Sequence, residues 1–206
     1  MNELTNIYKN SSSPQEYAKK YFKHLVNIMD RIDTNSIGEV IDLILDTRNK
    51  GKSIYFIGNG GSAATASHFA NDLSIGTRTS GLKPFKAISL TDNMAVITAI
   101  GNDNGYEEIF LRQLEVAIQP GDIVVAISAS GNSPNLIKAI NFAKERKNKV
   151  VGLTGFDGGE LKKLSDFNIH IPTDKGEYGP VEDFHMILDH LFGTYLNQVV
   201  LDERRV

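Results

Sequence analysis

The 206-residue sequence contains no cysteine, so it can hold neither a disulfide framework nor a thiolate metal site. Nothing in it points to an oxidising compartment, and a reducing cytosol is the simplest expected location. The sequence also lacks a run of the roughly 18 to 20 apolar residues that cross a bilayer. Its start lacks the basic and then apolar pattern of a secretory signal. We therefore expect a soluble, cytoplasmic protein without a membrane partner.

An excess of either charge is missing as well. The 22 lysines and arginines nearly balance the 25 aspartates and glutamates, which gives a formal net charge of −3. A dedicated nucleic-acid binder usually carries a concentrated positive field, so we expect no nucleic-acid partner. Hydrophobic residues make up 41% and charged residues 23% of the chain, which is typical of a globular protein and excludes a disordered or fibrous one.

The first part of the chain, residues 1–52, is predicted to be a helical extension. Ser13 is followed by Pro14 and, three residues after Ser13, by Glu16, which together form a helix-start signal. A second helix is expected from about Asn35 until about Gly51. The apolar positions of this pair exceed what one face of a surface helix needs, so we expect part of it to pack against another subunit.

The remainder, residues 53–206, alternates short β-branched runs with helical stretches. Continuously apolar strands such as 123–127 are expected where helices cover both faces of a sheet. The alternation predicts an α/β fold with a doubly wound, five-stranded parallel sheet in a single compact domain. The expected strands are 53–57, 85–89, 123–128, 149–154 and 167–171, and the expected helices are 62–73, 92–100, 106–116, 134–146, 160–164 and about 180–201.

Two of the expected strands end in loops rich in small polar residues, namely 58–62 (GNGGS) and 128–133 (SASGNS). Glycines let the backbone approach a ligand closely, and the amides of the following helix start point towards an anion. Hydroxyls and amides on one turn can hold a phosphate without Lys or Arg. Either loop alone is equally compatible with a capped tight turn, but two such loops in one sheet favour a ligand site. Neither has a Walker lysine, which argues against nucleotide triphosphate hydrolysis, and neither has a dinucleotide fingerprint.

Imidazoles and carboxylates occur in two clusters. His68 and Asp72 lie four residues apart on one helix face and could bind the same metal or substrate, although such a pair is more often a surface or capping pair. On the last helix, spacing favours Glu182, His185 and Asp189 along one line. Glu182 and His190 lie about 80° apart around that helix, which also permits convergence. The alternative is a solvated acidic helix face.

The two polar loops, His68-Phe69-Ala70, the stretch 98–103 (TAIGND) and the stretch 182–190 together resemble sugar isomerase (SIS) domains, and within them the phosphoheptose isomerase branch. The similarity runs from about residue 16 to residue 201. It implies a flavodoxin-like fold and a homotetramer with sites at subunit interfaces. It also implies an aldose–ketose isomerase that converts sedoheptulose 7-phosphate into D-glycero-D-manno-heptose 7-phosphate.

The resemblance assigns a metal site to His68, Asp72, Glu182 and His190, with Asp72 and His190 also moving protons. Two imidazoles and two carboxylates are a donor set that suits zinc. His185 remains a second candidate for the acid/base. Phosphoheptose isomerases usually have Glu at the position of Asp72 and Gln at that of Glu182. The loss of one methylene shortens the reach of Asp72 by about 1.5 Å, and Glu182 adds a negative charge that would tighten a divalent cation and repel an anionic enediolate. The implied substrate-binding residues are Asn59, Gly60, Gly61, Ser62, Asp72, Asn102, Asp103, Ser128, Ala129, Ser130, Ser133 and Glu182.

Two other functions stay open. The substitutions at Asp72 and Glu182 suit a SIS enzyme for another phosphosugar in surface-polysaccharide synthesis. Some SIS proteins of similar sequence are non-catalytic and bind a partner protein in bacterial replication initiation, and these typically lose the metal and acid/base positions. This chain keeps metal-competent side chains at all four positions, which favours an enzyme.

Overall fold

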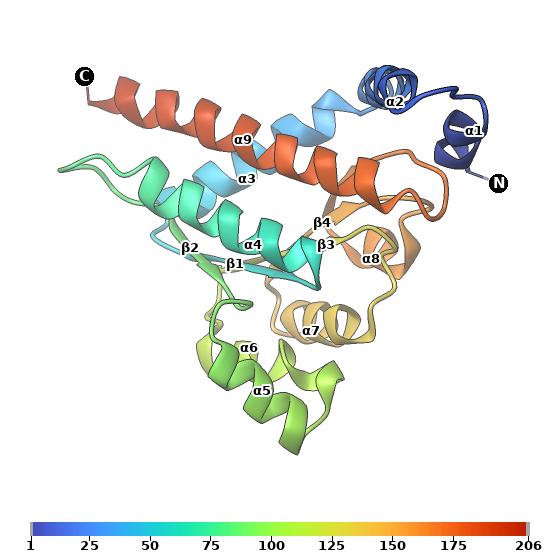
Figure 1. The fold of residues 1–206 in the computed structure, drawn as a ribbon. Helices are drawn as coiled ribbons and strands as arrows, with labels where there is room; N and C mark the ends of the chain where they lie inside the picture. Colours follow the sequence, from blue (N-terminus) through green and yellow to red (C-terminus); the bar gives the residue numbers. More distant parts are fainter. Residues whose placement is uncertain (1, 205–206) are drawn as a thin grey trace.

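The computed structural model of the chain describes residues 2–204 and contains a five-stranded, all-parallel sheet (Figure 1). The strands are β1 (Ser53–Gly58), β2 (Lys86–Ser89), β3 (Ile123–Ser128), β4 (Lys149–Thr154) and β5 (Phe167–His170), in the order β2-β1-β3-β4-β5. This confirms the predicted doubly wound α/β fold. The strand order reverses between β1 and β3, and ligands of such sheets bind at that point, beyond the carboxyl ends of the strands.

Helices cover both faces of the sheet, and successive strand residues therefore alternate between two apolar cores. Ile54 and Phe56 of β1 belong to the core under α3 (Thr34–Asn49), α4 (Gly61–Asn71) and α9 (Tyr178–Glu203). Tyr55 and Ile57 belong to the core on the other face, under α6 (Leu111–Ala117), α7 (Pro134–Glu145) and α8 (Gly159–Leu164). Two covered faces explain why the central strands are continuously apolar.

The N-terminal helices are α1 (Glu3–Lys9), α2 (Pro14–Met29) and α3. The predicted start of α2 is confirmed, because the Ser13 side chain accepts a hydrogen bond from the Glu16 amide at 3.2 Å. Helix α1 lies inside the stretch expected to be a helical extension, but the sequence did not predict it as a separate helix. It is one short helix capped by Asn2 and buries only Ile7, so it carries little periodic apolar signal.

Two predicted helices are wrong in their extent. The helix expected at 62–73 gives way after α4 to a π-helical turn, η1 (Asp72–Gly76), and the Ser74 hydroxyl of this turn donates a hydrogen bond to the Ala70 carbonyl of α4 at 2.6 Å. Such side-chain bonds compete with the regular backbone ladder. The helix expected at 106–116 is divided into a short 3₁₀ segment, η2 (Tyr106–Glu108), and α6. Helix α5 (Met94–Asp103) starts two residues and ends three residues later than expected.

Helix α9 is 26 residues long and crosses the same face of the sheet as α4 (Figure 1). Aromatic rings join the two helices to the sheet: Phe56 and Phe69 are stacked with ring centres 4.9 Å apart, and Phe69 and Phe192 meet edge to face with ring centres 5.5 Å apart. In the part of the chain that the structure describes, neither α9 nor any other helix combines the length and apolarity needed to cross a membrane.

A buried guanidinium fixes the far end of α9. Arg48 of α3 is 1% exposed, donates to both carboxylate oxygens of Glu203 at 2.6 and 2.9 Å, and donates from Nε to the Lys83 carbonyl at 2.7 Å. Its guanidinium also lies 5.1 Å from the centre of the Phe85 ring. One side chain therefore ties α3, the end of α9 and the segment before β2 together.

We expect Arg48→Ala to lower the free energy of unfolding by about 2–4 kcal/mol, because it removes a packed side chain and three hydrogen bonds at once. Urea denaturation of the two proteins measures this. Arg112→Ala is the matched control, since Arg112 makes ion pairs with Glu108 and Glu115 at a half-exposed position and should change stability by less than about 0.5 kcal/mol. Equal effects of the two substitutions would contradict the assignment.

Candidate functional site

The two polar loops lie side by side because β1 and β3 are neighbours, with Gly58 paired to Ile127. Asn59 closes the gap between them: its amide and that of Asn135 on α7 exchange two hydrogen bonds, at 2.9 and 2.8 Å. The Tyr106 hydroxyl also donates to the Asn59 side-chain oxygen at 2.9 Å. Asn135 is buried, and sequence reasoning missed its role in holding the first loop against the second.

The second loop has a fixed backbone that presents its hydroxyls. Ser128 Oγ accepts a hydrogen bond from the Gly131 amide at 3.1 Å. Gly131 has φ = +65°, and a Cβ there would lie 2.0 Å from the Gly158 carbonyl oxygen, so only glycine fits this turn. Ser133 is the residue before α7, yet its side chain makes no cap bond to the helix. The loop thus ends at a helix N-terminus with a hydroxyl available to a ligand.

A cavity of about 190 Å³ lies between these loops and the start of α9. Seven of the predicted substrate-binding residues line it, together with Tyr178, which sequence reasoning did not single out, and Ile127. The predicted residues in its wall are Asn59, Ser62, Ser128, Ala129, Ser130, Ser133 and Glu182.

The other predicted substrate residues lie outside this wall. Gly60 (φ = +55°) and Gly61 form the turn into α4, and a Cβ on Gly61 would lie 2.4 Å from the Glu182 Oε2 atom. Gly61 therefore lets the Glu182 carboxylate sit against the start of α4. Asn102 and Asp103 lie at the exposed end of α5 and hydrogen-bond to each other at 2.8 Å.

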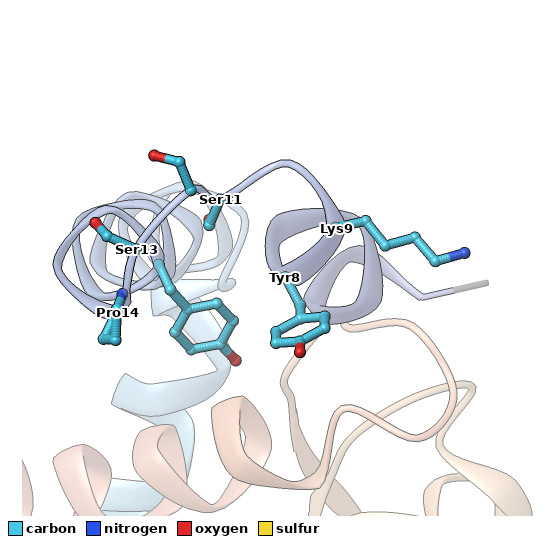
Figure 2. A pocket seen from close by; sticks show the side chains of 7 residues that line it. Tyr8, Lys9, Ser11, Ser13 and Pro14 are labelled. Carbon is cyan, nitrogen blue, oxygen red and sulfur yellow. The ribbon is translucent and has the colours of Figure 1, made fainter.

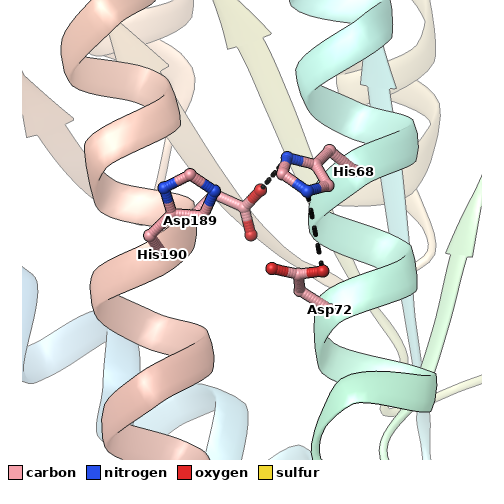
Figure 3. Close-up of side chains that lie close together, drawn as sticks. All are labelled: His68, Asp72, Asp189 and His190. Atoms are coloured by element: carbon pink, nitrogen blue, oxygen red, sulfur yellow. Dashed lines mark ion pairs between the residues drawn. The ribbon is translucent and has the colours of Figure 1, made fainter.

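A second constellation lies further along the same two helices (Figure 3). His68 of α4, Asp72 at the start of η1, and Asp189 and His190 of α9 each offer a ligand atom, and these atoms all lie within 4.8 Å of one another. His68 stands between the carboxylates, with Nε2 3.7 Å from Asp72 Oδ1 and Nδ1 3.1 Å from Asp189 Oδ2. The His68 and His190 ring centres are 5.2 Å apart. Asp72 therefore reaches His68 despite its short side chain.

This group contains three of the four predicted metal ligands and one other residue. The structure brings together His68, Asp72 and His190, whereas Glu182 lines the neighbouring cavity and lies outside the group. The resemblance did not assign Asp189 to the metal site. The sequence signal for Asp189 was its helical spacing with Glu182, which places the two residues on one line of the helix. His185, the second candidate for the acid/base, is completely buried and belongs to neither place.

Asp189 gives an independent reason to expect a cation in this group. Its side chain is 0% exposed, and neither carboxylate oxygen has a hydrogen-bond partner among the described residues. Burial raises the pKa of Asp189 to about 6, with a further rise from the Asp72 charge and a partial offset from His68 and His190. A buried carboxylate with so few partners is costly unless positive charge lies nearby. Two imidazoles and two carboxylates form a donor set that suits zinc.

A larger cavity, of about 660 Å³, lies between α1 and α2 and is lined by Tyr8, Tyr17 and the residues that join these helices (Figure 2). Its lining comes from α1, α2 and the turn between them, and not from the two strand-end loops. The amide and the hydroxyl of Ser12, which lines this cavity, both donate hydrogen bonds to the Glu16 carboxylate. The hydrogen bond from Lys20 is the largest of the effects that lower the Glu16 pKa to about 2, so this helix start carries its own anion.

Comparison with known proteins shows similarity along most of the chain. A family model described as "SIS domain" matches residues 20–155. The phosphoheptose isomerase of Geotalea daltonii is 39% identical over 169 residues, covering 82% of this chain and 86% of that protein. The phosphoheptose isomerase of Aliarcobacter butzleri is 36% identical over 174 residues, covering 84% and 90%. The solved structure of phosphoheptose isomerase GmhA from Neisseria gonorrhoeae superposes with a TM-score of 0.80 at 30% identity, covering 90% of this chain and all of that one.

The buried His185 should make the protein less stable in acid. Burial lowers the pKa of the folded-state imidazole from 6.5 to about 4, so below pH 6.5 the unfolded chain binds a proton that the folded protein does not. Stability is therefore lost as the pH falls from 6.5 towards 4, by about 3 kcal/mol. The opposite contribution of Asp189 is common to both proteins and cancels when wild type is compared with His185→Leu.

Urea denaturation at pH 7, 5.5 and 4.5 measures this difference. The stability of the wild type should fall relative to that of His185→Leu across the series. Parallel pH dependences of the two proteins would show that the folded protein tolerates a charged His185 and would contradict the prediction.

Proposed function

This chain belongs to the SIS-domain family, and we propose that it is a phosphoheptose isomerase, an enzyme that converts sedoheptulose 7-phosphate into D-glycero-D-manno-heptose 7-phosphate. The observation that carries this proposal is the course of α9. Its start lines the serine-rich cavity through Glu182, and seven residues later it contributes Asp189 and His190 to the ionisable group. Seven residues of helix span about 10 Å, so the site has two separate ends, as a phosphorylated sugar chain with its carbonyl at the opposite end requires.

The serine-rich cavity is the proposed phosphate end. The hydroxyls of Ser128, Ser130 and Ser133 line it, and α7 begins directly after Ser133. A helix N-terminus favours an anion because its first amides are unsatisfied and its dipole is positive there. Asn59, Gly60 and Gly61 would lie along the sugar, while Glu182 and Tyr178 close the cavity from α9.

The ionisable group is the proposed reacting end. An aldose–ketose exchange moves a proton from the carbon beside the carbonyl to the carbonyl carbon, through an enediol. We assign one of Asp72 and His190 as the base that removes the proton and the other as the acid that returns one. Both side chains also line a second cavity, of about 380 Å³, on the outer side of the group. The reaction needs no redox cofactor and no attacking water.

We propose zinc as the cofactor of this site, held by His68, Asp72 and His190, with the fourth position left for a substrate oxygen. Glu182, which the resemblance offers as the fourth ligand, lies against Gly61 instead. Catalytic zinc commonly has three protein ligands and an open position. When bound, the ion would polarise the carbonyl and hydroxyl oxygens of the sugar. The extra negative charge of Glu182, compared with the Gln usual in the resembled enzymes, would hold the cation more tightly.

A homotetramer is the proposed assembly, and two exposed apolar strips support it. Phe22, Val26 and Met29 share one exposed face of α2. A similar strip on α9 consists of Ile187, Leu191 and Tyr195. Exposed apolar strips of this kind mark protein interfaces. Asn102 and Asp103, which lie away from the cavity of their own chain, would then be positioned to serve a site of a neighbouring copy.

We place the reaction in the cytoplasm, because a charged sugar phosphate does not cross a bilayer and is retained where it is made. The small-molecule partner is the sugar phosphate, and the product would feed the synthesis of lipopolysaccharide or capsule heptose. No nucleic-acid partner is proposed, in keeping with the faintly acidic net charge of −3.

Incubation with sedoheptulose 7-phosphate in D₂O, followed by proton NMR, should yield an aldoheptose 7-phosphate that carries deuterium beside the carbonyl. Asp72→Asn and His190→Gln should each slow this by 10²- to 10⁴-fold, the usual contribution of a general acid or base. Asp46→Asn, which alters an exposed ion pair with Lys50 on α3, is the matched control and should leave the rate unchanged. EDTA should abolish turnover and added zinc should restore it.

Three outcomes would contradict parts of the proposal. Turnover of a different phosphosugar alone would correct the substrate and leave the chemistry. Unchanged activity in EDTA would remove the metal. No turnover and no exchange in a folded protein without bound zinc would point to a non-catalytic binding protein.

The assembly is tested by sedimentation at micromolar concentration. The wild-type protein should sediment as a tetramer, and Phe22→Glu combined with Met29→Glu should reduce its mass because two charges enter the apolar strip of α2. Val116→Glu is the matched control, since Val116 is 86% exposed on α6 and lies outside both strips. A wild-type monomer would overturn the proposed assembly.

A further inference from the structure

We propose that Asp189 is a positioning residue that holds His68 with its proton on Nδ1, so that the lone pair of Nε2 faces Asp72. This proposal deepens the proposed metal-dependent function and rests on it. It gives Asp189 a task different from that of a ligand: the residue would set the orientation and tautomer of a ligand supplied by another helix. Nothing in the spacing of His68 and Asp72 along α4 reveals this partner.

The surroundings of Nδ1 indicate which ring nitrogen carries the proton. Nδ1 lies 3.0 Å from the sulfur of Met186 and 3.1 Å from Asp189 Oδ2. A thioether sulfur and an ionised carboxylate are acceptors only. Both short approaches are favourable when Nδ1 bears the hydrogen and repulsive when it bears the lone pair. The neutral ring must then keep its lone pair on Nε2.

The distances from the two ring nitrogens of His68 indicate different roles for the carboxylates of Asp72 and Asp189. Around a tetrahedral zinc with ligands at about 2.0–2.2 Å, neighbouring ligand atoms lie about 3.4 Å apart. The 3.7 Å between His68 Nε2 and Asp72 Oδ1 is close to this ligand-to-ligand distance, so these two atoms can bind the same ion. Asp189 Oδ2 lies 3.1 Å from the other ring nitrogen, Nδ1, which is an ion-pair distance. Figure 3 shows each carboxylate beside a different nitrogen of the His68 ring.

Asp189 has no competing task in the described part of the chain. It is fully buried, neither of its oxygens has a hydrogen-bond partner there, and its Oδ2 makes the ion-pair contact with His68 Nδ1 at 3.1 Å. Met186 and Asp189 lie three residues apart on α9, so one face of this helix supplies both acceptors. Carboxylates that accept from the second nitrogen of a metal-binding histidine orient the ring, and their loss typically lowers metal affinity by 10- to 100-fold.

Long-range proton–nitrogen NMR of the ¹⁵N-labelled, full-length protein tests the tautomer directly. We expect His68 to be protonated on Nδ1 in the metal-free wild type and to bind added zinc through Nε2. Asp189→Leu should give a mixture of tautomers and weaken zinc binding by 10- to 100-fold in a chelator competition. Asp189→Asn, which keeps an acceptor oxygen without the charge, should lie between the two.

Two matched variants isolate Asp189. Met186→Leu removes the other acceptor and should leave the tautomer and the zinc affinity unchanged. Asp183→Asn alters a carboxylate of the same helix that accepts a hydrogen bond from the Tyr21 hydroxyl, and it should also leave both unchanged. The Asp189 variants should fold, because they remove a buried charge whose ion-pair contact with His68 is not supported by any hydrogen bond to its oxygens among the described residues.

A wild-type His68 protonated on Nε2, zinc bound through Nδ1, or a tautomer that responds to Met186→Leu but not to Asp189→Leu would overturn the proposal. A zinc-loaded structure with an Asp189 oxygen at bonding distance would also overturn it, by making Asp189 a ligand. If the wild type binds no zinc, the metal of the proposed function fails, while the tautomer spectrum still decides the role of Asp189.

Discussion

The packing of α9 against α4 is the constraint on which the rest of the site depends. The two helices meet over the sheet through Phe69 and Phe192, whose rings are 5.5 Å apart. On one side of this contact Gly61 leaves room for the Glu182 carboxylate, and on the other Gly193 lies close to Asp72. The aromatic contact, with a glycine on either side of it, thus brings together two polar clusters whose residues lie far apart in the sequence.

This arrangement places ionisable groups where a stable core would have apolar ones. Asp189 and His185 are fully buried on the face of α9 that packs towards α4 and the sheet. Burial disfavours the charged form of each, which raises the pKa of Asp189 and lowers that of His185. Local departures from the rules of core packing are expected at functional sites. The π-helical turn that begins at Asp72 is another such departure, and π-turns of this kind often occur at functional sites.

The fold and one half of the site follow from local patterns. Short β-branched runs alternating with helical stretches predicted each strand to within one residue, and the serine loop was predicted because its hydroxyls are close together in the chain. Asn135 was missed because its partner, Asn59, lies 76 residues away and no local pattern marks the pair. Asp189 was missed as a member of the ionisable group for a related reason. Helical spacing places it with Glu182, but the structure puts Asp189 beside His68 and Glu182 beside Gly61.

The sequence by itself determined the parallel α/β fold, the two polar loops and the pairing of His68 with Asp72, because each depends on residues that are neighbours along a strand, turn or helix. Only the tertiary structure decided which carboxylate of α9 faces His68, and where Glu182 and His185 lie. Spacing along a helix specifies which residues share a face. The residues opposite that face depend on how two helices cross, and this is set by side chains such as Phe69, Phe192 and Gly61 that lie far apart in the chain.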